Sequence, residues 1–133
     1  MAKLLFLCIE NANRTQMAEA FAKIYGGDHV EVYSAGINPV EAVNPVAVEA
    51  MKELGYDISE QLPTFINELP DVEFDYVVNM GIGYEYTSIP AKNRLEWDLP
   101  NPKELDLKEY RKVRDLIEGN VKILVNKLEP AKD

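Results

Sequence analysis

One short stretch of the chain combines three side chains that can do chemistry on an oxyanion. Cys8, the one cysteine of the sequence, follows an apolar run at residues 3–7, and Arg14 and Thr15 come six and seven residues later. If a strand ends at the cysteine and a helix starts near the arginine, backbone N–H groups, a positive helix end and a guanidinium face one spot. Such a spot binds a tetrahedral oxyanion and favours the thiolate form of Cys8. The spacing therefore predicts a nucleophilic cysteine.

The alternative interpretation of Cys8 is structural, because a lone cysteine is usually a small buried hydrophobic residue. The strand before it, the helix after it and the position of Thr15 beside Arg14 favour the nucleophile. A single thiol cannot form a disulfide within the chain, which fits a reducing compartment. His29, the one histidine, follows a turn and is expected at the surface, and no cluster has metal-ligand spacing. We therefore expect no metal site.

Length and composition indicate one domain that spans residues 1–133. No apolar run approaches the roughly 20 residues that a membrane span needs, and no secretory signal is recognisable, so we expect a cytoplasmic protein with no membrane partner. The net charge is −9 and the basic residues form no stripe, which argues against nucleic acid as a partner. An anionic ligand would be captured by a local site, because the charge of the whole molecule repels it.

Apolar strands alternate with amphipathic helices, a pattern typical of βα units on a parallel sheet. Strands are expected at residues 3–7, 30–33, 75–80 and 94–97, helices at 16–25, 45–54 and 106–128, and a short helical turn within 57–71. Asn44 before Pro45, and Asp106 with Glu109, are typical of helix N-termini. The four strands predict a three-layer α/β sandwich, a parallel sheet with helices on both faces and the flavodoxin-like order 2-1-3-4. That order places the ligand crevice at the end of the first strand, beside Cys8.

The sequence also resembles a known family. Residues 4–21, which read LLFLCIENANRTQMAEAF, resemble the low-molecular-weight protein tyrosine phosphatases and are closer to their arsenate reductase branch. Further similarity lies in YSAG at 33–36, NP at 44–45, EWDLPNP at 96–102 and YRKVRD at 110–115. The resemblance covers nearly the whole chain, with a specific first motif and supporting later ones.

The resemblance assigns roles to residues of the first motif. It implies that Cys8 attacks phosphorus or arsenic in line while the following loop holds the oxyanion. The oxyanion-binding residues would be Ile9, Glu10, Asn11, Ala12, Asn13, Arg14 and Thr15. Arg14 would bind two oxygens bidentately, Thr15 would hydrogen-bond the thiolate, and Asn11 would brace the loop together with Ser34. Simple helix and turn capping is the alternative role of Thr15 and Asn11, and the two roles are compatible.

Two departures from the family pattern concern the loop and the redox chemistry. Glu10 stands where the phosphatases have glycine, so its carboxylate must point away from the oxyanion, and we expect a rim residue that shapes selectivity. Arsenate reductases that relay a disulfide internally have further cysteines after the third strand, where this chain reads MGIGYEY at 80–86. Arsenate reduction would therefore need an external thiol, such as a small thiol, glutaredoxin or thioredoxin.

A third departure concerns the general acid. The family aspartate precedes a proline, and the matching pair in this chain is Asn101 and Pro102. Asparagine cannot donate a proton as an acid, so Asp98 becomes the candidate if the loop takes a different path, with a loop cap beside Pro100 as its alternative role. General acid catalysis contributes about 10²–10⁴-fold, so slow turnover of poor leaving groups is expected.

Three functions remain open from the sequence. The leading one is a phosphatase that hydrolyses phosphotyrosine-like monoesters through a phosphocysteine at Cys8, with Tyr84, Tyr86 and Trp97 either walling a cleft for the aromatic ring or simply packing. The alternative is an arsenate reductase that uses Cys8 with glutathione and glutaredoxin, or with thioredoxin. The third is a catalytically weak module that binds phosphate or a phosphorylated partner. None of the three requires a cofactor.

Overall fold

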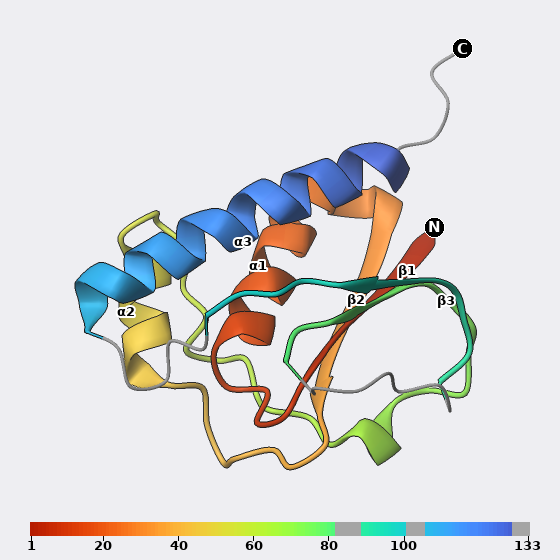
Figure 1. Ribbon diagram of the computed structural model, residues 1–133, viewed down its shortest axis with the longest axis horizontal. Helices are drawn as coiled ribbons and strands as arrows, with labels where there is room; N and C mark the ends of the chain where they lie inside the picture. Colours follow the sequence, from red (N-terminus) through yellow and green to blue (C-terminus); the bar gives the residue numbers. More distant parts are fainter. Residues whose placement is uncertain (82–88, 101–105, 129–133) are drawn as a thin grey trace.

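The computed structural model describes residues 1–81, 89–100 and 106–128, and it contains a four-stranded parallel sheet (Figure 1). The strands are β1 (Ala2–Cys8), β2 (Val30–Gly36), β3 (Phe74–Asn79) and β4 (Ala91–Glu96). They lie in the order β2-β1-β3-β4, and each neighbouring pair is parallel, which confirms the expected 2-1-3-4 arrangement. The central position of β1 brings its carboxyl end, at Cys8, between the ends of β2 and β3.

Three α-helices pack against one face of the sheet (Figure 1). They are α1 (Arg14–Gly26), α2 (Pro45–Lys52) and α3 (Leu107–Leu128). The buried stripe of α3 includes Tyr110, Val113, Ile117, Val121 and Leu124, the helical spacing that the sequence predicts. The expected caps are present as well: the side chains of Asn44 and Asp106 accept hydrogen bonds from the backbone N–H groups of Val46 and Glu109. No helix of the described chain is both long and apolar enough to cross a bilayer.

The opposite face of the sheet carries a thinner layer. The helical element that covers it in the described ranges is the 3₁₀-helix η2 (Ile66–Glu68), which is the short helical turn expected within 57–71. Leu5 and Leu7 of β1 are fully buried on this face, whereas Leu4 and Phe6 are fully buried under the α-helices. From Leu4 to Cys8 β1 is therefore apolar at every position, because parallel strands covered on both faces have no solvated side.

Some boundaries differ from the expected ones. β4 spans 91–96 and ends before Trp97, whereas the sequence pattern predicted a strand at 94–97. β4 is an edge strand that carries Lys92, Asn93 and Arg94, and such polar residues on an edge weaken the apolar pattern that marks a strand. α1 begins at Arg14, two residues before the predicted start, so the arginine belongs to the first turn of the helix.

Candidate active site

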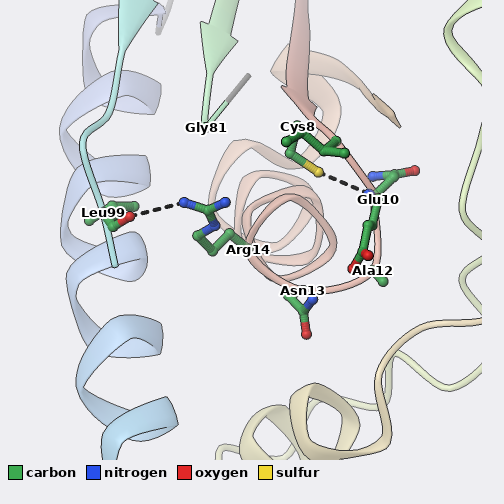
Figure 2. Close-up of a pocket in the computed structure, with 9 residues that line it drawn as sticks. Cys8, Glu10, Ala12, Asn13, Arg14, Gly81 and Leu99 are labelled. Carbon is green, nitrogen blue, oxygen red and sulfur yellow. Dashed lines mark hydrogen bonds between the residues drawn. The ribbon is translucent and has the colours of Figure 1, made fainter. Parts of the chain in front are cut away.

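The loop between β1 and α1 forms the floor of a cavity at the carboxyl end of the sheet (Figure 2). Cys8 is the last residue of β1 and is 5% exposed, and Arg14 is the first residue of α1. The cavity measures about 440 Å³ and is lined by Cys8, by residues 9–13, by Arg14, and by Gly81 and Leu99 on the other side. The structure therefore brings all the predicted loop residues except Thr15 into the wall of one cavity.

The sulfur of Cys8 lies against polar groups of the loop and of α1. The backbone N–H of Asn11 donates to Sγ at 2.9 Å, and the hydroxyl of Thr15 lies 3.1 Å from Sγ. Thr15 is fully buried beneath the cavity and contacts the sulfur from there. Both contacts stabilise negative charge on the sulfur.

Burial nevertheless raises the pKa of the Cys8 thiol above its ordinary value. The hydrogen bonds from Thr15 and Asn11 and the charge of Arg14 act in the opposite direction but do not outweigh the loss of solvent. The expectation of a thiol shifted toward thiolate is therefore wrong, because the sequence shows the favourable neighbours of Cys8 but not the depth of its burial. These neighbours still stabilise the sulfur whenever it carries charge during a reaction.

Asn11 holds the loop in its shape. Its φ of 54° lies in the left-handed region, and both ends of its side chain are bonded: Nδ2 donates to Thr15 Oγ1 at 2.8 Å, and Oδ1 accepts from the N–H of Thr64 at 2.8 Å. The bracing role expected for Asn11 therefore has direct contacts, although the partners include Thr64, which no sequence motif indicated. The hydroxyl of Ser34, the other residue expected to support the loop, donates to Glu19 at 2.6 Å, and its supporting role stays a prediction.

The segment after β2 fixes the orientation of the loop peptides. The N–H groups of Ile37, Asn38, Val40 and Asn44 donate to the carbonyls of residues 8, 9, 10 and 12. Because N–H and C=O point in opposite directions across a trans peptide, these bonds turn the loop N–H groups away from the segment and toward the cavity. Gly36 permits the close approach, since a Cβ there would lie 2.5 Å from the carbonyl oxygen at position 9.

Arg14 extends along the cavity wall toward Leu99 (Figure 2). Its Nη1 donates to the carbonyl oxygen of Leu99 at 2.9 Å, while its Nη2 lies against the backbone of Gly81. Burial lowers the pKa of Arg14, and the interaction with Cys8 raises it in part. An arginine nevertheless stays protonated at any physiological pH. The guanidinium is therefore a fixed positive charge between the loop and the segments after β3 and β4.

Asn13 connects the loop to α3. The hydroxyl of Tyr110 donates to Asn13 Oδ1, and both side chains are buried. The sequence places Tyr110 only in the apolar stripe of a helix, so nothing in the pattern marks it as a support of the loop.

A family model described as low molecular weight phosphotyrosine protein phosphatase matches residues 3–133. The chain belongs to this family. Two curated relatives cover nearly the same length: an arsenate reductase of Halalkalibacterium halodurans is 40% identical over 90% of this chain and 91% of its own, and arsenate reductase 1 of Staphylococcus epidermidis is 35% identical over 94% and 96%. A solved structure of an arsenate reductase in the phosphate-binding state has a TM-score of 0.90 at 31% identity, over 97% of this chain and all of that one.

The general acid of this phosphatase family remains a prediction in this chain. Asp98 lines a second cavity of about 320 Å³, together with Asn79, Glu96 and Trp97, and does not line the cavity around Cys8. Asn101 lies outside the described residues, as do Tyr84 and Tyr86.

Trp97 both packs and lines the second cavity, because its ring lies 5.8 Å from the ring of Phe6. His29 is exposed in the one-turn helix η1 (Gly27–His29), next to the amino-terminal end of β2 and thus at the opposite end of the parallel strands from Cys8. Among residues 1–81, 89–100 and 106–128, no group of three or more acidic, histidine or cysteine residues could hold a metal ion.

Proposed function

We propose that the chain reduces arsenate to arsenite, with Cys8 as the nucleophile and a thiol from outside the chain as the reductant. The observation that carries the proposal is the position of the Cys8 sulfur at the base of a cavity, with an N–H donor at 2.9 Å and Arg14 in the wall. The similarity to two arsenate reductases over about nine-tenths of the chain supports arsenate as the oxyanion. Arsenate and phosphate are both tetrahedral oxyanions, and one relative is an arsenate reductase in a phosphate-binding state.

In the first step the Cys8 sulfur attacks the arsenic of hydrogen arsenate. An S–As bond forms, an As–O bond breaks, and the hydroxide leaves as water with the proton that the thiol gives up. Because burial raises the pKa of Cys8, the thiol carries that proton into the step and the arsenate oxygens can pass it to the leaving group. This route does not require an acid at Asn101. Arg14 and the loop N–H groups stabilise the oxygens throughout.

In the second step an external thiolate attacks the sulfur of the Cys8 adduct. The S–As bond breaks, its electron pair remains on arsenic, and arsenic passes from the +5 to the +3 state as the two sulfurs form a disulfide. The sequence has one cysteine, so both the attacking sulfur and the thiol that later frees Cys8 must come from other molecules. Glutathione with glutaredoxin, or thioredoxin, are the candidates. Thr15 and Asn11 stabilise the Cys8 thiolate as it leaves the mixed disulfide.

Hydrolysis of phosphate monoesters through a phosphocysteine is the second candidate, and the family membership of the chain favours it. An alcohol or phenol leaving group needs a proton that Asn101 cannot supply as an acid. We therefore expect slow hydrolysis of activated aryl phosphates, and a gain in rate for Asn101→Asp if residue 101 reaches the leaving oxygen.

The test runs two assays on one preparation: arsenite formation from arsenate with glutathione and glutaredoxin or with thioredoxin, and hydrolysis of an aryl phosphate. We expect arsenite formation that is lost in Cys8→Ser, while orthophosphate still binds to the variant, because the loop and Arg14 remain. Asp28→Asn, an exposed change in η1 at the opposite end of the strands from Cys8, is the control and should keep the parent rate.

Three results would contradict the proposal. Aryl phosphatase activity without arsenite would select the second candidate. Equal arsenite rates for the parent and Cys8→Ser would remove Cys8 from the mechanism. Orthophosphate binding with neither activity would leave a phosphate-binding module.

A further inference from the structure

A second cavity adjoins the catalytic one. It measures about 320 Å³ and shares Arg14, Gly81 and Leu99 with the cavity that holds Cys8. The rest of the catalytic cavity consists of Cys8 and the loop at residues 9–13. Among the described residues, Arg14, Gly81 and Leu99 therefore form the boundary between the two cavities, and a molecule in the second cavity lies next to the site of the sulfur, on the side away from the loop at residues 9–13.

The walls that belong to the second cavity alone have an acidic character. They are Asn79 at the end of β3 and Glu96, Trp97 and Asp98 at the end of β4. Both carboxylates are on exposed residues, and Oε1 of Glu96 accepts a hydrogen bond from the side chain of Asn79 at 3.3 Å. Two carboxylates attract a cation and repel an anion, and the net charge of −9 adds to the same preference.

We propose that the second cavity binds the reductant of the reaction, and that the reductant is a small thiol that carries an ammonium group. The inference rests on the proposed arsenate reduction, which needs an external sulfur to reach Cys8. The ammonium group would lie near Glu96 and Asp98 with the half-buried Trp97 as the floor, and the sulfur would point across Arg14 and Leu99 toward Cys8.

The reaction in this cavity balances with two molecules of the aminothiol. The first attacks Sγ of the Cys8–arsenic adduct, so that an S–S bond forms, the S–As bond breaks and arsenite leaves with the electron pair. The second attacks the sulfur of the bound aminothiol, which releases Cys8 and a symmetrical disulfide. The acidic subsite binds the first aminothiol and keeps it in place as the mixed disulfide, whose outer sulfur the second aminothiol then attacks.

The first experiment measures arsenite formation by the full chain with three small thiols of different charge: cysteamine, 2-mercaptoethanol and 3-mercaptopropionate. Rates are compared per concentration of thiolate, so that differences in thiol pKa are removed. We expect cysteamine to exceed 2-mercaptoethanol by about fivefold, the factor that an exposed ion pair supplies, and 3-mercaptopropionate to be the slowest. The preference should shrink in high salt, since salt screens exposed charges.

The second experiment removes the carboxylates. Glu96→Gln and Asp98→Asn should each lower the ratio of the cysteamine rate to the 2-mercaptoethanol rate, and the double variant should bring it close to one. Asp28→Asn changes the net charge by the same amount as either single variant, but at the opposite end of the parallel strands, and should keep the parent ratio.

A third measurement needs no arsenate. The mixed disulfide at Cys8 is followed by mass after addition of cystamine, bis(2-hydroxyethyl) disulfide or 3,3′-dithiodipropionic acid, and cystamine should react fastest in the parent but not in the double variant. Equal rates for the three reagents, a preference for the anionic ones, or a cysteamine preference that survives in the double variant would overturn the inference. So would arsenite formation with thioredoxin alone and none with small thiols. Absence of arsenite with every thiol, together with a cystamine preference, would instead reject the proposed reaction and keep the acidic subsite for the ammonium group.

Discussion

Gly81 and Arg14 lie so close together that no other residue fits at position 81 without moving the guanidinium. A Cβ on Gly81 would lie 2.5 Å from Nη2 and 3.1 Å from Cζ of Arg14, and its φ of +117° is a conformation that other residues rarely adopt. The arginine thus has a backbone contact after β3 on one side and the carbonyl of Leu99 on the other. Its position is set by segments far from the motif in the sequence.

Gly81→Ala should therefore weaken the oxyanion site. We expect the inhibition constant of orthophosphate to rise by roughly tenfold, because the charge-assisted contact predicted between Arg14 and the oxyanion is weakened when the guanidinium shifts. Gly119→Ala is the matched control, since Gly119 lies in α3 and an added Cβ meets no atom within 4 Å. The control should keep phosphate affinity and gain about 0.5–1 kcal/mol of stability, because alanine is favoured over glycine within a helix. Unchanged affinity in Gly81→Ala would show that the arginine is not fixed by this contact.

Thr15→Ala should shift the reactivity of Cys8 to higher pH. The Thr15 hydroxyl lowers the pKa of the thiol, so its loss leaves burial with less opposition and raises the pKa further. The thiol is protonated below its pKa and reacts with iodoacetamide above it, so the midpoint of the alkylation rate should move upward in the variant. Thr64→Ala is the control: the Thr64 hydroxyl bonds to the carbonyl of Leu62, and the bond to Asn11 uses the Thr64 backbone. A lower midpoint in Thr15→Ala would contradict the role given to Thr15.

Tyr110→Phe should loosen the loop from within the core. The change removes the hydroxyl that donates to Asn13 and leaves a buried carbonyl oxygen without that donor, which costs about 1–3 kcal/mol. We expect a lower melting temperature together with weaker orthophosphate binding. In Tyr25→Phe the lost hydroxyl contacts Glu118, and this variant should leave phosphate binding as it is. Equal phosphate affinity in Tyr110→Phe and the parent would limit Tyr110 to packing.

The nucleophile motif could be predicted from the sequence because its parts are local. An apolar strand, a helical stripe and the spacing of Cys8 and Arg14 all lie within the first 25 residues, and the caps at Asn44 and Asp106 depend on their own side chains. Strand order followed as well, because chirality and short connections leave few arrangements of four parallel strands.

The contacts that the sequence did not predict join residues far apart in the chain. Thr64 bonds to Asn11 across 53 positions, and Tyr110 to Asn13 across 97. The bond from the Ser34 hydroxyl to Glu19 on α1, across 15 positions, was not predicted either. The direction of the Cys8 pKa shift depends on burial, which only the folded chain determines.

A carboxylate between α2 and α3 should make the stability of the fold depend on acid pH. Glu53 follows the last residue of α2, and its carboxylate accepts from Arg111 at 2.6 Å and from Arg114 at 2.8 Å, both on α3. The hydrogen bonds from Arg111 are the largest cause that lowers the pKa of Glu53 from 4.5 to about 2. Protons therefore bind more strongly to the unfolded chain than to the folded one between these two values.

The sign of the effect follows from that difference. The contribution of Glu53 to the free energy of unfolding is complete above pH 4.5 and declines as the pH falls toward 2. The free energy of unfolding measured with urea should therefore fall more steeply across this window for the parent than for Glu53→Gln. At neutral pH the variant should be the less stable of the two, and the difference should close near pH 2. Glu60→Gln removes an exposed carboxylate from the segment after α2 and should follow the parent curve. Parallel curves for the parent and Glu53→Gln from pH 7 to 2 would mean that solvent screens the Glu53 pairs completely, and that the other contacts, such as the bond from Arg114 to the Ala50 carbonyl, join α2 to α3.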